Sequence, residues 1–231
     1  MLRFFQMVRS GLVRGDGGRL FASLGCMALF AATSCIAQAQ SAGTTQVHDA
    51  SALHPPANAR VAIVEFDDLE CPACAATNSL LKSAAAKYQI PWIHHELLIP
   101  SHVWSPAATV NAHWFEAKSK ALGDEYRDAV FANQGSIYNT GMLTQFTQNF
   151  AKAHGMALPF SLDPQGKFAA EVQQDNELAK RTGITKTPTI FIVTQNSKGA
   201  PFIEVTNPQT QLYTDIDRAI EDTKAGAARG R

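Results

Sequence analysis

Two cysteines lie only three positions apart in this sequence, in the run Cys71-Pro72-Ala73-Cys74. If a helix begins here, the two sulfurs lie about one turn apart. They are then close enough to form a disulfide with each other, or for Cys74 to resolve a mixed disulfide at Cys71. The first sulfur also lies beside the unpaired N–H groups and the positive dipole end of that helix, and both favour the thiolate that attacks disulfides. The spacing therefore predicts thiol–disulfide exchange.

Two structural uses of the same pair are alternatives to redox chemistry: half of a zinc site, or a passive disulfide. Zinc normally takes four ligands, and the sequence offers no second C-x-x-C and no suitably spaced pair of histidines. A disulfide across so short a loop restricts few unfolded conformations, so it stabilises a fold only slightly. We therefore prefer redox chemistry, with no metal site and no bound cofactor, because the cysteines themselves carry the electrons.

The segments around the pair predict a strand before it and a helix after it. Residues 61–66, Val-Ala-Ile-Val-Glu-Phe, are mostly apolar and typical of a strand buried on both faces. A helical pattern starts at Cys71, with Pro72 in the first turn, where its missing N–H is harmless. Residues 92–99 predict a second strand. Strand, helix and strand together form a βαβ unit.

The middle of the chain is expected to be helical throughout. Apolar residues at helical spacing mark four helices, and this spacing indicates core packing far more often than a ligand site. The first of these helices is expected to carry Val110, Trp114, Ala117 and Ala121 on one face. The last is expected to end at Gly183.

The chain after these helices returns to the β pattern. Residues 187–194 predict a strand opened by a proline, followed by a turn at 197–199 and a short strand at 201–205. Asn207 and Pro208 then form a favourable N-cap and first-turn pair for a last helix. The expected order of elements is therefore a βαβ unit, a helical middle section, two strands and a last helix, which makes the chain an α/β protein.

The sequence here resembles a known family. Residues 64–74, Val-Glu-Phe-Asp-Asp-Leu-Glu-Cys-Pro-Ala-Cys, the helical insertion and Thr187-Pro188 before a strand are similar to the DsbA-like thiol–disulfide oxidoreductases of the thioredoxin superfamily. The resemblance covers residues 60–224 and implies a thioredoxin fold, a central mixed β-sheet flanked by helices with a helical insertion domain. The implied divisions are a thioredoxin-like domain at 60–100 and 184–225 and an inserted helical domain at 101–183.

The resemblance also implies a role for each matching residue. Cys71 matches the exposed nucleophile that forms the mixed disulfide, and Cys74 matches the buried thiol that resolves it. Pro188 matches the family's cis-proline, which faces the active-site disulfide, and a cis bond is far more accessible before proline than before other residues. Thr187 is then expected to offer its backbone to a substrate peptide as an added strand. The alternative is an ordinary proline at a strand edge.

Glu65 lies six residues before Cys71, where the family carries a buried acid beneath the active site. In an otherwise apolar strand its charge is costly unless it is paired or protonated. We interpret Glu65 as the proton acceptor for Cys74, because acids with perturbed pKa values gather at active sites. The alternative is an acid at the margin of the sheet.

Departures from the family pattern bear on the direction of electron flow. The strongest oxidants of the family carry histidine where this chain has Ala73, and alanine cannot stabilise a thiolate at Cys71. The acids Asp67, Asp68 and Glu70 just upstream are expected to disfavour that thiolate if they lie near it. A less stabilised thiolate makes a less oxidising disulfide. The sequence therefore predicts a milder oxidant than DsbA, or a reductase.

The first 39 residues predict export. Residues 1–39 combine four arginines, an apolar run at 20–32 and Ala-Gln-Ala at 37–39, which is the pattern of a cleaved signal peptide. An amphipathic or membrane-anchoring N-terminus is the alternative. The run Ala32-Thr33-Ser34-Cys35 loosely resembles a bacterial lipobox and suggests lipoprotein anchoring at Cys35 as a lesser one. Residues 40–59 are polar and contain prolines, so we expect a flexible segment. The predicted location is the periplasm or another exported compartment.

Composition and length limit the partners. A formal net charge of zero makes nucleic acid an unsuitable partner, and no run reaches the roughly 18 apolar residues of a membrane span. The roughly 20 residues before Val61 are too few for the N-terminal dimerisation domain of disulfide isomerases, so we expect a monomer. By the family resemblance, its partners are cysteine-containing exported proteins and a membrane redox partner of the DsbB or vitamin K epoxide reductase (VKOR) type.

Two functions of other classes remain as alternatives. A copper or zinc chaperone could use Cys71 and Cys74 with a histidine such as His95, and a peptide-binding module could keep the fold without catalysis. His94 and His95 alternate along a strand, so at most one of them is expected to face the core. The histidines at 102, 113 and 154 show no metal-like spacing.

Overall fold

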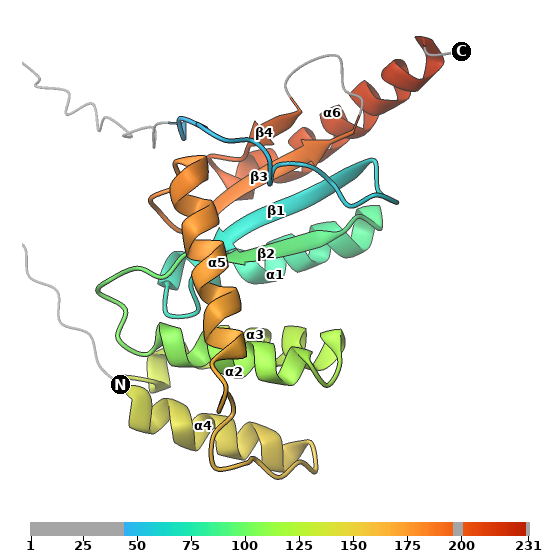
Figure 1. Cartoon of the computed structure of the whole chain (residues 1–231). Coiled ribbons are helices and arrows are strands. Elements are labelled where there is room, and N and C mark those ends of the chain that lie inside the picture. Colours follow the sequence, from blue (N-terminus) through green and yellow to red (C-terminus); the bar gives the residue numbers. More distant parts are fainter. Residues whose placement is uncertain (1–43, 196–200, 230–231) are drawn as a thin grey trace, which may run out of the picture. The chain divides into compact units, whose positions relative to one another are not determined.

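The computed structural model describes residues 44–195 and 201–229 (Figure 1). The predicted signal peptide at 1–39, Cys35 and the predicted turn at 197–199 lie outside the described residues. In the part of the chain that is described, no helix has both the length and the apolar character needed to cross a bilayer.

Four strands form one mixed sheet in the spatial order β2-β1-β3-β4. They are β1 (Val61–Asp67), β2 (Trp92–Glu96), β3 (Thr189–Thr194) and β4 (Phe202–Glu204). Strand β1 is parallel to β2 and antiparallel to β3, and β3 is antiparallel to β4. All seven residues of β1 are buried, as its apolar sequence predicts for an inner strand.

The second strand is shorter than predicted. It ends at Glu96 rather than at residue 99, because β1 ends at the facing residue Asp67. The N–H of Leu97 still donates to the carbonyl of Asp67 at 2.8 Å, and the next two N–H groups bond to side chains instead of to a strand. The N–H of Leu98 donates to Asn176 Oδ1 at 2.9 Å, and the N–H of Ile99 donates to Asp68 Oδ2 at 2.8 Å.

Helices cover both faces of the sheet (Figure 1). Helices α1 (Pro72–Tyr88) and α6 (Pro208–Arg229) pack on the face that carries Val61 and Ile63. The opposite face, which carries Val64, is covered by the C-terminal part of α5 (Lys167–Thr182). The core of the sheet domain therefore includes part of the segment that was assigned to the insertion.

Residues 44–59 form no helix or strand, but they pack onto the sheet domain rather than extending freely from it. The side chain of Leu53 is only 1% exposed and lies in the core beneath α5. The hydroxyl of Thr45 donates to Glu204 Oε1 at 2.8 Å, and the N–H of His48 donates to the carbonyl of Thr182 at 3.0 Å. One buried leucine and these hydrogen bonds therefore hold a segment whose composition predicts flexibility.

The insertion between β2 and β3 is helical, as predicted. Its elements are α2 (Ser105–Glu116), α3 (Lys120–Asn133), the short 3-10 helix η1 (Gln134–Ser136), α4 (Thr140–Ala153) and α5. The prediction that Ala117 and Ala121 share one helix with Val110 is wrong. The chain breaks after Glu116, and the Ser119 hydroxyl caps a new helix by accepting the N–H of Leu122 at 3.1 Å.

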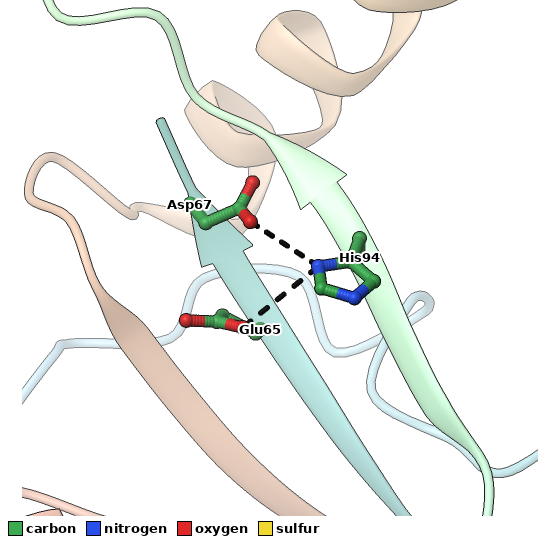
Figure 2. A group of neighbouring side chains, drawn as sticks. All are labelled: Glu65, Asp67 and His94. Carbon is green, nitrogen blue, oxygen red and sulfur yellow. Dashed lines mark hydrogen bonds and ion pairs between the residues drawn. The ribbon is translucent and has the colours of Figure 1, made fainter. Parts of the chain in front are cut away.

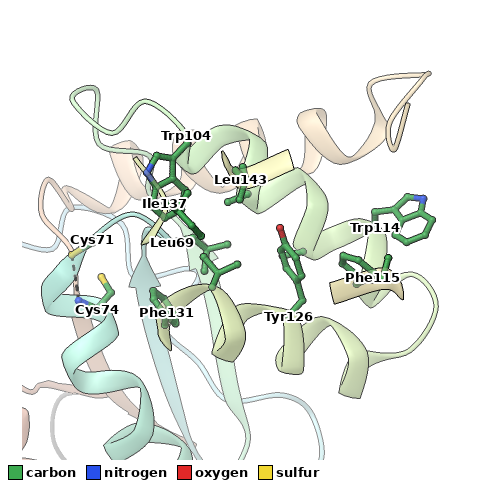
Figure 3. Packing of buried hydrophobic residues seen from close by; sticks show 14 residues of the cluster. Leu69, Cys71, Cys74, Trp104, Trp114, Phe115, Tyr126, Phe131, Ile137 and Leu143 are labelled. Atoms are coloured by element: carbon green, nitrogen blue, oxygen red, sulfur yellow. Dashed lines mark hydrogen bonds between the residues drawn. The ribbon is translucent and has the colours of Figure 1, made fainter. Parts of the chain in front are cut away.

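A single apolar cluster joins the insertion to the start of α1 (Figure 3). Phe115 and Tyr126 lie in its interior with ring centroids 4.7 Å apart. Trp104, only 2% exposed, lies at the end of the cluster nearest the cysteines. The same cluster contains Cys71 and Cys74, so the packing of the insertion directly supports the cysteine pair.

Candidate active site

Cys71 is the N-cap of α1, at the junction of the first strand and the first helix. Its Sγ accepts the backbone N–H of Cys74 at 3.3 Å, and Pro72 occupies the first turn. The pKa of Cys71 falls from 9.0 to about 6. Hydrogen bonds involving the thiol of Cys74, Thr187 and the backbone of Cys74 and Ala73 lower it, and they outweigh burial, which raises it. The helix start therefore favours the thiolate at Cys71.

Cys74 has the opposite environment. Its side chain is fully buried in the apolar cluster. Burial raises the pKa of Cys74, and hydrogen bonding to Cys71 and the negative charges of Asp67, Cys71 and Glu65 raise it further. Both cysteines are free thiols in this structure. The geometry thus describes a dithiol in which Cys71 readily ionises while Cys74 keeps its proton.

The loop before β3 lies against Cys71 although it is more than 100 residues away in the chain. The thiol of Cys71 donates to the carbonyl of Thr187 at 3.5 Å. The Thr187–Pro188 peptide bond is cis, and both residues are half-buried. The structure therefore brings together the cysteine pair and the Thr-Pro dipeptide that the sequence analysis singled out.

The expectation that Cys71 is exposed is wrong. Only 5% of its surface is accessible, because it lies beneath the Thr187 carbonyl and packs in the cluster with Leu69 and Trp104 (Figure 3). The neighbouring Pro72 and Ala73 are exposed. The exposed Pro72-Ala73 turn is therefore the surface that directly adjoins the covered Cys71 thiol.

Glu65 lies in the inner strand, so the alternative of an acid at the sheet margin is wrong. It faces His94 of β2 on one side and Ile190 of β3 on the other, and it is 2% exposed. The indole N–H of Trp92 donates to Glu65 Oε2 at 3.0 Å. Burial and the neighbouring charge of Asp67 raise the pKa of Glu65 well above its ordinary value.

Sequence reasoning missed the partners of this acid. The Nδ1 atom of His94 lies 3.2 Å from Asp67 Oδ2 and 3.8 Å from Glu65 Oε2 (Figure 2). One oxygen or nitrogen from each of these three side chains lies within 4.8 Å of the others, a spacing that could also hold a metal ion. The available signal was the two-residue period of a strand, which places Glu65 and Asp67 on one face.

A cation from the insertion completes the cluster. Arg127 of α3 is 5% exposed and forms an ion pair with Glu96, and its Nη1 lies 3.7 Å from Asp67 Oδ1. His113 Nε2 lies 3.4 Å from Glu96 Oε1. Asp67 is therefore connected to the insertion through the Arg127 guanidinium, and Glu96 is connected to it through both Arg127 and His113.

The acids next to Cys71 do not act as the sequence analysis expected. Glu70 Oε2 accepts the N–H groups of Trp104 and Ser105 at 2.7 and 3.0 Å, at the start of α2. Asp68 Oδ1 accepts the N–H of Glu70 at 2.8 Å. These carboxylates hold the loop, and the pKa of Cys71 is lowered although they are near in sequence.

His95 does not join the cysteine pair, so the metal set of Cys71, Cys74 and His95 is not assembled. Its Nδ1 lies 2.8 Å from Asp175 of α5, and its ring packs against Phe66. Phe66 belongs to the face of β1 opposite α1. The strand period therefore places His95 on the far side of the sheet from the cysteines.

Comparisons with known proteins agree with this geometry. A family model described as thioredoxin matches residues 56–207. Disulfide bond formation protein D of Bacillus subtilis (strain 168) is 24% identical over 151 residues, which are 58% of this chain and 64% of that protein. The chain thus spans less than two thirds of the length of this relative.

Two solved structures are similar to the described fold. Alpha-DsbA1 of Wolbachia pipientis has a TM-score of 0.61 at 18% identity, covering 75% of this chain and 92% of that chain. Oxidised BdbD of Bacillus subtilis has a TM-score of 0.59 at 18% identity, and the match covers 79% of this chain and 98% of that chain. The predicted thioredoxin fold with inserted helices is confirmed, as is the resemblance to DsbA-type proteins.

Proposed function

The chain belongs to the thioredoxin family, and from that premise we propose that it is an exported thiol–disulfide oxidoreductase that introduces disulfides into secreted or periplasmic proteins. The observation that carries the proposal is the asymmetry of the cysteine pair. The pKa of Cys71 is lowered to about 6, whereas burial raises that of Cys74. A good leaving thiolate beside a protonated buried thiol suits dithiol–disulfide exchange.

The exchange begins with the Cys71–Cys74 disulfide. A substrate thiolate attacks Cys71 Sγ, the bond between the two cysteines breaks, and Cys74 leaves as a thiolate that takes up a proton. A second substrate thiolate then attacks the substrate sulfur of the mixed disulfide, and Cys71 leaves as a thiolate. Two electrons pass from the substrate dithiol to the protein, and no bound cofactor is needed.

Three further residues have proposed roles in this exchange. Glu65 exchanges the proton of Cys74, supported by its burial, its raised pKa and the effect of its charge on the pKa of Cys74. Thr187 and Pro188 bind the substrate peptide beside Cys71 as an added strand, supported by the contact of the Thr187 carbonyl with the Cys71 thiol.

A reductase of the same fold is the second candidate. A lower thiolate pKa stabilises the reduced form and makes the disulfide more oxidising. The value of about 6 for Cys71 lies between the roughly 3.5 of DsbA and the roughly 7 of thioredoxin. Ala73, which cannot stabilise the thiolate with its side chain, also favours a mild oxidant. We therefore place oxidase before reductase.

The setting of the activity is proposed from the sequence and the relatives. The signal pattern at 1–39 supports export, with lipoprotein anchoring at Cys35 as a lesser alternative. We propose a monomer that acts on cysteine-containing exported proteins. A membrane partner of the DsbB or VKOR type would accept the two electrons and restore the disulfide.

The redox potential of the chain without residues 1–39 tests the proposal. The protein is equilibrated across glutathione ratios, free thiols are trapped by alkylation, and the mass shift of two sulfhydryls is read. A potential between about −120 and −180 mV supports disulfide donation, whereas one near about −270 mV supports the reductase. If Cys71 and Cys74 never form a disulfide with each other, the enzyme proposal is wrong.

Two controls separate the other classes of function. If the protein is an oxidoreductase, thiol–disulfide exchange must vanish in Cys71→Ser. If it is a peptide-binding module, Cys71→Ser keeps its peptide affinity, and the unsubstituted protein shows no exchange. Stoichiometric copper or zinc in the purified protein, lost in Cys71→Ser, would instead support a metal chaperone.

A further inference from the structure

The thiol of Cys74 must gain and lose a proton during the exchange reaction, although it is buried together with its acidic neighbours. Cys74 is fully buried, and Glu65 and Asp67, whose charges raise its pKa, are 2% and 0% exposed. Each cycle delivers one proton to the departing Cys74 thiolate and removes one when the disulfide is restored. A carboxylate can exchange that proton with Cys74, but a carboxylate without solvent contact needs a partner that can pass it on.

His94 is an imidazole that reaches from these acids towards solvent. Its Nδ1 lies 3.2 Å from Asp67 Oδ2 and 3.8 Å from Glu65 Oε2. Dashed lines mark both interactions in Figure 2. His94 is also the most accessible of the three, with 13% of its side chain exposed. An imidazole is suited to proton transfer near neutral pH because it can accept a proton on one nitrogen and release one from the other.

Two hollows border His94 on its outer side. Their volumes are about 210 and 250 Å³, and both are lined by Trp92, His94 and residues of α3. Glu65 and Asp67 line neither hollow. His94 is therefore in contact with the buried carboxylates on one side and with space large enough for water on the other.

The neighbours of His94 hold its ring in this position. The ring centroids of Trp92 and His94 are 4.3 Å apart, and the indole N–H of Trp92 fixes Glu65. Charged groups from four other elements face His94 or the two hollows. They are Glu65 and Asp67 of β1, Lys82 of α1, His113 and Glu116 of α2, and Lys120, Asp124, Arg127 and Asp128 of α3, together with Glu96 of the same strand.

The same three side chains could hold a metal ion, but their surroundings favour a proton. Arg127 already places a positive charge 3.7 Å from Asp67 Oδ1, and the N–H of Trp92 already donates to the Glu65 oxygen nearest His94. A divalent cation would compete with both groups.

We propose that His94 is a positioning and proton-relay residue that carries the proton of Cys74 between the buried pair Glu65 and Asp67 and solvent. When Cys74 leaves as a thiolate, a carboxyl of the pair gives it a proton and takes one from the His94 imidazolium, which recovers it from water. When Cys74 attacks a mixed disulfide, the proton moves outward along the same route. This inference rests on the proposed exchange activity, and it adds the path of the proton.

The test measures the two halves of the exchange separately. Reduced protein is mixed with oxidised glutathione, samples are quenched in acid, and mass spectrometry follows the glutathione adduct. Formation of the adduct reports attack by Cys71, and its decay reports attack by Cys74. In His94→Gln we expect formation within about two-fold of the unsubstituted protein and decay at least about 10-fold slower, a smaller effect than the roughly 10²–10⁴-fold of direct general acid–base catalysis because His94 acts through the carboxyls.

A chemical rescue distinguishes a relay from a structural role. His94→Ala leaves room beside the two hollows, so added imidazole should restore the decay rate in proportion to its concentration. Thiazole, a ring of similar size without an N–H, should not. His95→Gln is the matched control, since His95 is the next residue and pairs with Asp175 on the opposite face. If His94→Gln shows no cooperative unfolding transition and therefore has not folded properly, His94→Asn is used in its place.

Several outcomes would overturn the inference. Decay at the original rate in His94→Gln, equal slowing of formation and decay, or no effect of imidazole would each exclude a relay. A bound divalent metal whose removal by a chelator reproduces the His94→Gln rates would assign the site to a metal instead. If the unsubstituted protein forms no adduct or never closes its disulfide, the proposed exchange function fails first.

Discussion

The thiol of Cys71 donates to the carbonyl of Thr187 at 3.5 Å, across 116 positions of sequence. This contact joins the start of α1 to the loop that leads into β3. It also leaves only 5% of Cys71 accessible. The residue proposed to attack substrates is therefore a covered thiol, held between the backbone N–H of Cys74 at the start of α1 and the Thr187 carbonyl.

The ionisation of Cys71 gives the first prediction. Because the surrounding hydrogen bonds lower its pKa to about 6, alkylation of the reduced protein should rise with pH through a midpoint near 6. The rate is measured with iodoacetamide under pseudo-first-order conditions, and peptide mapping assigns the modified cysteine. Cys74 should stay unmodified in the folded protein, because it is fully buried and its pKa is raised. A midpoint near 9 would contradict this account of the helix start.

The same shift predicts how the two redox forms differ in stability. The pKa of Cys71 in the folded protein lies below its ordinary value of 9.0. Ionised Cys71 therefore adds fully to the free energy of unfolding of the reduced protein above pH 9, and this contribution is lost as pH falls through about 6. The oxidised form has no such thiol. Urea unfolding of both forms from pH 5 to pH 8.5 should therefore show that, above pH 6, the free energy of unfolding of the reduced form rises relative to that of the oxidised form. Parallel curves would contradict the prediction.

Much of the site could be predicted because its signals are local. The cysteine spacing, Pro72 in a first turn and the apolar run 61–66 place the pair between a strand and a helix. The burial of Glu65 follows from the same run. Each of these inferences depends on neighbours within about ten residues, where periodicity and capping rules are strong.

The remaining features depend on long-range placement. The contact between Glu65 and His94 requires the register of two strands, and Arg127 reaches the acids from a helix whose position no local pattern indicates. The burial of Cys71 likewise depends on Trp104 and the distant Thr187 loop. The break after Glu116 was missed because apolar spacing continues across it while Ser119 caps a new helix.

Gln134 of η1 holds the loop that carries the nucleophile. Its side-chain amide donates to the carbonyls of Leu69 and Cys71 at 2.7 and 3.1 Å. Gln134→Ala should lower the free energy of unfolding by about 1–3 kcal/mol, since two hydrogen bonds are lost from a half-buried site. Asn133→Ala is the control, because Asn133 is exposed and bonds only within its own helix, and it should change stability by less than about 0.5 kcal/mol. Equal effects would show that the loop does not depend on Gln134.

The raised pKa of Glu65 gives a stability prediction with a defined sign. The folded state keeps a proton on Glu65 that the unfolded state releases at lower pH, so this group makes the protein less stable as pH rises above the ordinary value of 4.5. Glu65→Gln keeps an acceptor for Trp92 and removes the charge. Its free energy of unfolding should exceed that of the unsubstituted protein at pH 7.5, and the advantage should shrink towards pH 4.5. A less stable variant at pH 7.5 would show that Glu65 is ionised and paired.

Arg127 is the guanidinium that faces two buried carboxylates, and its loss should be far more damaging than the loss of a surface lysine. Arg127 holds the pKa of Glu96 well below its ordinary value although burial opposes it. In Arg127→Met, Glu96 and Asp67 stay buried without their cation, so the free energy of unfolding at pH 7.5 should fall by about 3–5 kcal/mol. The deficit should narrow at pH 5, because carboxylates that have lost their cation protonate more easily.

Lys82→Met, which breaks only the exposed pair with Asp128, should change stability by about 0–1 kcal/mol in the same urea titrations. A deficit of that small size for Arg127→Met as well would mean that Glu96 and Asp67 do not depend on Arg127 for their charge balance.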